Sequence, residues 1–282
     1  MIKVNFINGI KNKRFLITIF IGIGILILGI YNQIADYLFV DFSAPDIADQ
    51  SGFAQTIYND IFNKYSLWGD SLTMFMTSIP LLCAIAYTTS FRDEVSCGMN
   101  KFINTRISNE KYTITKLITS SLIGGLSVLV PVIIVSTLIF IIFNGEINNS
   151  YLYGAYGGMY VDLFNNNFMV YFIMHLGIVF LMGASYSTIA LAVSTKTKNI
   201  IGILLSPLIF YLIISIVYPM IGTTRFSPER IFQFYENPTV PLIEILISLA
   251  IVYIISSLVF LHFSKKEFIY EPSKEKKFFA FN

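Results

Sequence analysis

Six long apolar stretches run along this chain, and polar connections separate them. Each stretch has about the 20 predominantly apolar residues that an α-helix needs to cross the hydrocarbon core of a bilayer. The expected spans are residues 15–37, 71–90, 116–143, 168–194, 200–219 and 241–263. The pattern predicts an all-α polytopic membrane protein, with residues 1–282 forming a single domain of six transmembrane helices.

The basic residues are distributed unevenly among the connections. If each stretch crosses the membrane once, 16 of the 19 Lys and Arg residues fall on one side. The other side holds Lys64, Arg225 and Arg230. Because Lys and Arg next to a span resist translocation, we expect the cation-rich side, with both termini, to be cytoplasmic.

Composition and the first span support the membrane assignment. Hydrophobic residues make up 55% of the chain and charged residues 13%, against roughly 25% charged in a soluble domain. The first span follows a basic segment but lacks the small-x-small cleavage site of a signal peptide, so we expect a retained anchor. Cys83 and Cys97 are poorly placed to pair and are expected to be free thiols.

The connection between the second and third spans contains an amphipathic pattern over residues 91–107. Its apolar positions recur at three- and four-residue spacing, with charged residues between them. These positions are Phe91, Val95, Gly98, Met99 and Phe102. The pattern predicts a short helix along the inner membrane surface, opened by a loose capping pair of Ser90 and Asp93. Such a helix is either a solvated connection anchored by its apolar side chains or a docking element for a cytoplasmic partner.

Residues 1–14 show a similar pattern. Ile2, Phe6, Ile7 and Ile10 fall on one side, and most of the lysines fall on the other. We expect an interfacial helix, and attraction of its cations to anionic lipid headgroups explains it without a special role. The aromatic residues of the outer connections, including Phe232, Phe234 and Tyr235, are expected at the membrane interface.

Motifs for chemistry on this chain are absent. The sequence has no GxxxxGK[ST] phosphate-binding loop, so ATP hydrolysis is not expected here. Metal-ligand spacings and nucleophile motifs are also missing, and we expect no catalytic, cofactor-binding or metal-binding residues and no nucleic-acid partner. His175 is the titratable residue that lies clearly inside a span. It is either a functional polar site or a neutral side chain bonded to a neighbouring Ser, Thr or carbonyl.

Two segments carry a family resemblance. The first has an acidic residue, a glycine, an apolar stretch, a turn with a serine, a basic residue and an aromatic residue, and a lysine that opens a span. These are Glu94, Gly98, Phe102, Ile103, Ile107, Ser108, Lys111, Tyr112 and Lys116. The second, Met182–Ile203, ends a span in small residues and leads through a polar turn to Asn199 and the next span. Together with the six spans they resemble bacterial ABC type-2 transporter permeases. Many members carry Arg or Pro before the basic turn, where this chain has Thr105–Ile107.

The resemblance implies a function and partners. It implies a permease subunit of an ATP-driven exporter in the bacterial plasma membrane, paired with a second, identical or paralogous permease and with a cytoplasmic ATPase that binds the ATP. It also implies that segment 91–107 is a coupling helix, whose charges set the register of docking. The docking residues would be Arg92, Asp93, Glu94, Val95, Gly98, Met99, Lys101 and Phe102.

The substrate and one rival class remain open. The Ile-, Asn- and Lys-rich sequence looks like those of small permeases that export amphipathic antimicrobial peptides from low-GC Gram-positive bacteria. The resemblance further implies that Ser227–Tyr235 forms a short re-entrant helix before the last span. The main alternative is a stand-alone channel or membrane immunity protein that acts without ATP. An intramembrane enzyme is the least favoured class.

Overall fold

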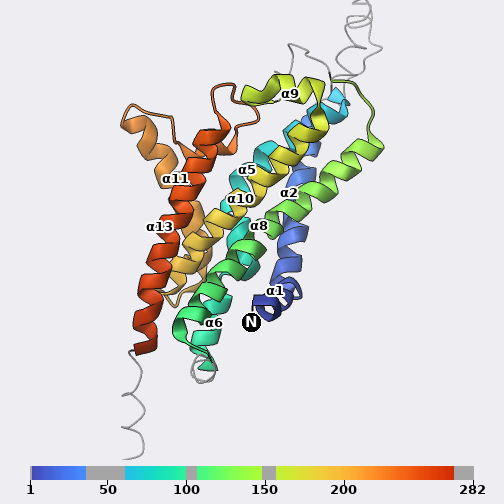
Figure 1. Ribbon diagram of the computed structural model, residues 1–282. Coiled ribbons are helices and arrows are strands. Elements are labelled where there is room, and N and C mark those ends of the chain that lie inside the picture. The colour runs from blue at the N-terminus through green and yellow to red at the C-terminus, as the bar shows by residue number, and fades with distance from the viewer. Residues whose placement is uncertain (1, 36–60, 100–106, 148–156, 270–282) are drawn as a thin grey trace, which may run out of the picture.

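The computed structural model describes residues 2–35, 61–99, 107–147 and 157–269 (Figure 1). Within these ranges the regular elements are helices, and no strand occurs. Six helices are long and apolar enough to cross a membrane, which confirms the predicted all-α polytopic architecture. They are α2 (Lys13–Ala35), α5 (Lys64–Tyr87), α8 (Asn109–Ile142), α10 (Phe168–Ser194), α11 (Ile200–Met220) and α13 (Leu242–Ile269).

Two helices begin earlier than the apolar pattern indicates. Helix α5 starts at Lys64 rather than at residue 71, and α8 starts at Asn109 rather than at residue 116. Polar residues in these first turns interrupt the hydropathy but not the backbone hydrogen bonding. Asn63 caps α5, because its side-chain oxygen accepts a hydrogen bond from the Tyr65 amide at 2.9 Å. Lys116 therefore lies inside α8 instead of opening it.

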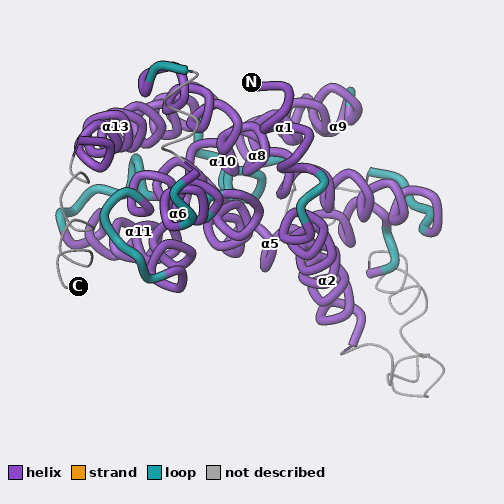
Figure 2. Tube along the Cα trace, turned by 90° about the horizontal axis from the view of Figure 1, so that it is seen from below, coloured by secondary structure: helices purple, strands orange, loops and turns teal. Residues whose placement is uncertain are grey.

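Helix α10 is the central element of the bundle. It packs against α8, α13, α5 and α11, while α2 packs against α5 and α8. Figure 2 shows α2 on one side of this centre and α11 and α13 on the other. Helices α11 and α13 both pack on α10 but barely contact each other.

Short helices lie at both ends of the bundle. Helices α1 (Ile2–Ile10) and α6 (Ser90–Ser96) lie at the same end as the end of α13, and α9 (Val161–Asn166) lies at the opposite end (Figure 1). The 3-10 helix η1 (Gly158–Tyr160) precedes α9, and α12 (Pro228–Phe232) connects α11 to α13. We call the end with α1 and α6 the basic end and the opposite end the far end.

Charge segregates between these ends. Lys64, Arg225 and Arg230 belong to the far end, and the other described Lys and Arg residues belong to the basic end. The segregation agrees with the distribution that the sequence predicts, and the cytoplasmic orientation of the basic end remains a prediction.

Helix α1 packs partly on the bundle. Phe6 and Ile10 contact a cluster that includes Tyr87 and Ile123, and Gly9 is buried beside them. Ile2 and Ile7, which the sequence pattern places on the same face, stay exposed. The helix thus attaches to the protein on one side and leaves other apolar side chains for the membrane interface.

Small residues allow α8 and α10 to cross closely. A Cβ atom at Gly124 would lie 2.4 Å from the Ser187 Cβ, and one at Gly183 would lie 2.7 Å from the Gly124 carbonyl oxygen. The Ser187 hydroxyl also donates a hydrogen bond to the Ser120 carbonyl at 3.3 Å. Glycine and serine stripes of this kind bring transmembrane helices into backbone contact.

Gly124→Val is expected to lower the free energy of unfolding by about 1–3 kcal/mol, because the new side chain overpacks the crossing. Gly177→Val is the matched control, since a Cβ at Gly177 in α10 meets nothing within 4 Å. Unfolding by SDS in one detergent measures both variants. Equal stability of the two would contradict the close crossing.

Candidate functional site

Helix α6 is a short continuation of α5 at the basic end. After Thr88 and Thr89, the Asp93 amide donates to the Thr89 carbonyl at 2.9 Å and begins the new helix. The helix ends when the Cys97 amide donates to the Asp93 carbonyl and Gly98 adopts a φ of 70°. Glycine takes this left-handed conformation without strain, so it terminates the helix.

A buried ion pair fastens α6 to α8. The Lys116 side chain is 0% exposed, and its Nζ lies 2.6 Å from Oε1 of Glu94, whose side chain is 24% exposed. The same ammonium donates hydrogen bonds to the Tyr87 hydroxyl at 3.0 Å and the Ser90 hydroxyl at 3.1 Å. The Tyr112 hydroxyl donates to the other oxygen of Glu94. All three donors of the ammonium therefore have acceptors.

The ion pair makes the position of α6 depend on α8. A charge removed from water is costly unless an opposite charge and hydrogen bonds compensate for it. Lys116 also lies over the Tyr87 ring, with Nζ 4.7 Å from the ring centroid. Moving α6 away from α8 would separate Glu94 from an ammonium that has no solvent contact. Helices α5, α6 and α8 are thus joined at one point.

A second, more exposed ion pair joins α6 to α2. The Arg14 Nη1 lies 2.8 Å from Oδ2 of Asp93, and the two side chains are 40% and 43% exposed. Arg14 also donates a hydrogen bond to the Thr89 hydroxyl. Exposed ion pairs contribute about 0–1 kcal/mol. The pair of Arg14 and Asp93 therefore contributes little to the stability of α6, whereas the buried pair of Lys116 and Glu94 fastens α6 to the bundle.

The apolar face of α6 points into the bundle. Phe91 is buried, and its ring centroid lies 5.2 Å from that of Phe260 in α13 and 6.4 Å from that of Tyr112 in α8. Val95 packs against the same cluster. These side chains fill the base of the bundle between α8 and α13.

The predicted docking residues therefore differ in their exposure and contacts. Asp93, Glu94 and Val95 contact other parts of this chain, and Arg92 and Gly98 are partly exposed. Met99 is exposed. Lys101 and Phe102 lie outside the described residues.

The predicted capping pair at the start of α6 is wrong. Thr89 occupies the N-cap position and makes no side-chain capping bond. Ser90 instead accepts a hydrogen bond from Lys116, and Asp93 pairs with Arg14. Both side chains are engaged by longer-range partners that a local capping pattern does not include.

His175 lies in an aromatic cluster toward the far end. The imidazole is buried, with its ring centroid 5.0 Å from that of Trp68 and 5.1 Å from that of Phe234. Neither ring nitrogen has a hydrogen-bond partner among the described residues. Among the described residues, the alternative of an imidazole bonded to a neighbouring Ser, Thr or carbonyl is not borne out, and aromatic rings surround the imidazole instead.

The segment between α12 and α13 supplies part of this cluster. Phe234 and Tyr235 of this segment, and Phe232 at the end of α12, are buried inside the protein, so these three do not anchor it to the membrane interface as the sequence predicts. The Tyr235 hydroxyl donates to the Thr73 hydroxyl at 3.2 Å, and burial raises the pKa of Tyr235. It therefore stays neutral at physiological pH. This segment closes the far end of the bundle over His175.

The described residues offer little for metal or thiol chemistry. Within them, no group of three His, Cys, Asp or Glu side chains could hold a metal ion. Cys83 is a buried free thiol in α5, and Cys97 is an exposed free thiol after α6. The ion-pair network around α6 is the candidate functional site. Its role is mechanical, because it links a peripheral helix to the three spans α2, α5 and α8.

Glu94→Gln is expected to lower the free energy of unfolding by about 3–5 kcal/mol, because it leaves a buried ammonium without its counter-charge. The neighbouring Asp93→Asn, which removes the same kind of charge from the exposed pair, is expected to cost less than about 1 kcal/mol. SDS unfolding of the full chain compares the two variants. Similar losses of unfolding free energy in both variants would show that the buried pair stabilises the protein no more than the exposed pair does.

His175→Phe is expected to keep or raise the free energy of unfolding, because it removes an unsatisfied buried polar group that costs about 1–3 kcal/mol. His175→Ala is expected to lower it by about 3–5 kcal/mol, as a cavity replaces an aromatic ring. Thermal unfolding in detergent distinguishes them. A phenylalanine variant clearly less stable than the parent would mean that the imidazole nitrogens are bonded.

Comparison of the chain with protein-family models, with curated proteins and with solved structures finds no match. What the structure establishes is a polytopic helical membrane architecture with a peripheral helix fixed to its spans by a buried ion pair.

Proposed function

We propose that this chain is the membrane-spanning permease subunit of a transporter driven by a separate ATPase at the basic end. The observation that carries the proposal is the buried pair of Lys116 and Glu94, with Nζ and Oε1 2.6 Å apart. It fixes a peripheral helix to the spans strongly enough to transmit a displacement. The resemblance of segment 91–107 to the coupling helix of ABC type-2 permeases supports the same function.

In the proposed mechanism, ATP-driven closure of the partner displaces α6. Because separating Glu94 from the enclosed Lys116 is costly, the displacement passes to α8 rather than being absorbed between the two helices. Helix α8 contacts α10 along the close crossing at Gly124 and Gly183. Packed helices of this kind move as units, so α10 carries the displacement to α11 and α13.

The proposal assigns different roles to the docking residues. Glu94, Asp93 and Val95 act as positioning residues, because they bind the rest of the chain. Met99 contacts the ATPase, and Arg92, Gly98, Lys101 and Phe102 complete that surface. ATP binds the partner, and a second permease subunit, identical or paralogous, completes the pathway. The substrate is an amphipathic molecule such as an antimicrobial peptide, moved out of the membrane or cell of a bacterium, in keeping with the resemblance.

Met99→Asp tests the docking surface. Met99 is 52% exposed at the basic end, and Met159 is 53% exposed in η1 at the far end, so Met159→Asp is a matched control. A charge at the centre of an apolar docking surface costs about 2 kcal/mol or more, which corresponds to at least a tenfold loss of bound partner. We expect this loss for Met99→Asp and none for Met159→Asp.

The measurement is purification of the tagged full chain from its native membrane in mild detergent. Mass spectrometry identifies the associated proteins, and ATP hydrolysis of the purified sample is assayed. Size-exclusion chromatography verifies that both variants are folded. Equal recovery of an ATPase with both variants would remove Met99 from the docking surface. Recovery of this chain alone in every sample would contradict the proposal and favour the stand-alone channel or immunity protein.

A further inference from the structure

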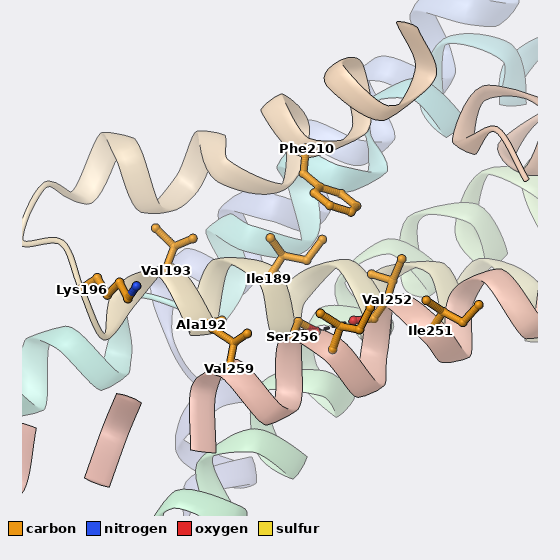
Figure 3. A pocket seen from close by; sticks show the side chains of 10 residues that line it. Ile189, Ala192, Val193, Lys196, Phe210, Ile251, Val252, Ser256 and Val259 are labelled. Carbon is orange, nitrogen blue, oxygen red and sulfur yellow. Dashed lines mark hydrogen bonds between the residues drawn. The ribbon is translucent and has the colours of Figure 1, made fainter. Parts of the chain in front are cut away.

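An apolar groove runs between α11 and α13 at the basic half of the bundle. It has a volume of about 370 Å³, with α10 as its floor (Figure 3). Ile189 and Val193 of α10, Phe210 of α11 and Ile255 and Val259 of α13 line it, and Lys196 stands at its basic end. The groove exists because α11 and α13 both pack on α10 without closing on each other.

The groove continues toward the far end. A second hollow of about 170 Å³ shares Phe210, Ile251 and Val252 with the first and extends to Leu249. From Val259 to Leu249 the path along α13 is about 15 Å at 1.5 Å per helical residue. That is half of the ~30 Å hydrocarbon thickness of a bilayer, the depth of one leaflet.

The walls of the groove suit hydrocarbon. Its polar lining residues are Ser256 and Lys196. The Ser256 hydroxyl is already bonded to the Thr188 hydroxyl and donates to the Val252 carbonyl at 2.6 Å. The first hollow therefore presents no free polar group except Lys196 at its end, and the second hollow adds the Ser248 hydroxyl, which has no hydrogen-bond partner among the described residues. Since α11 and α13 are spans with exposed apolar side chains on either side, the groove opens sideways to the acyl chains of the membrane.

Lys196 places a positive charge at the groove entrance. It follows the end of α10, in the turn that leads to α11, and its Nζ lies 3.8 Å above the Phe263 ring centroid. This cation–π contact holds the ammonium beside the apolar channel. No described carboxylate forms an ion pair with it, and the described part of α11 contains no acidic residue.

We infer that this groove binds one anionic phospholipid from the leaflet at the basic end. One acyl chain lies along α13 in the groove, and the lipid phosphate pairs with Lys196. A helix from a second copy fits poorly, because a 15 Å length of helix about 10 Å wide occupies over ~1,000 Å³. The inference rests on the groove and on the membrane architecture, and it does not depend on the proposed ATPase partner.

Competition between two lipids tests the headgroup contact. The purified full chain, in detergent with equal amounts of phosphatidylglycerol and phosphatidylcholine, is examined by native mass spectrometry. The parent protein should retain one molecule of phosphatidylglycerol in preference to phosphatidylcholine. Lys196→Gln should reduce this preference about fivefold, since a cation near an anionic headgroup contributes about 1 kcal/mol. Lys198→Gln, an equal charge change outside the groove lining, should leave it within about twofold.

Filling the groove tests the acyl-chain contact. Ile255 lines the groove and is 58% exposed, whereas the adjacent Ile254 is 55% exposed and does not line it. Ile255→Trp should lower retention of both lipids, and Ile254→Trp should not. Because both sites are exposed, both variants are expected to fold.

Four results would overturn the inference. The parent protein could retain no lipid, or Lys196→Gln and Lys198→Gln could behave alike, which would remove the headgroup contact. Unchanged lipid retention in Ile255→Trp would place the acyl chain elsewhere. A dimer mass without bound lipid that Ile255→Trp abolishes would make the groove an interface between two copies of the chain.

Discussion

The ammonium of Lys116, enclosed in the helix bundle, requires an anion and hydrogen-bond acceptors, and much of the basic end is arranged to provide them. Glu94 supplies the anion from α6, and Tyr87 and Ser90 supply acceptors from the end of α5 and the start of α6. This requirement determines where α6 lies, because the short helix carries the counter-charge. The inward position of Phe91 follows, since it lies on the face that α6 turns toward the bundle.

The two ends of the bundle are stabilised by different sets of contacts. The basic end combines the buried pair of Lys116 and Glu94 with the packing of Phe91, whereas the far end combines aromatic rings around His175 with an ion pair between Arg225 and Glu244. Between them, α8 and α10 touch through small residues. Helices α11 and α13 form the looser side, which leaves the apolar groove open to lipid.

The apolar pattern was sufficient to predict the six helices, because span length and hydropathy are local properties. The candidate site could not be predicted in the same way, because it depends on contacts between residues that are far apart in the sequence. Lys116 marked the start of a span in the sequence, since a lysine normally ends an apolar stretch. Its burial becomes intelligible only with Glu94, which precedes it by 22 positions. His175 stood out as an intramembrane polar residue, but its surroundings come from Phe234 and Tyr235, far along the chain. Phe91 and Val95 fitted an amphipathic stripe, and the pattern could not show that these two side chains pack between α8 and α13 while Met99 of the same stripe stays exposed.

The most direct test of this account is hydrogen exchange of residues 90–96, measured by mass spectrometry in the parent protein and in Glu94→Gln. If the buried pair holds α6, these amides exchange slowly in the parent protein. In the variant they should exchange on the order of a hundredfold faster, which corresponds to about 3 kcal/mol of lost holding energy. Equal exchange of this segment in both proteins would contradict the claim that Lys116 and Glu94 fix α6 to the spans.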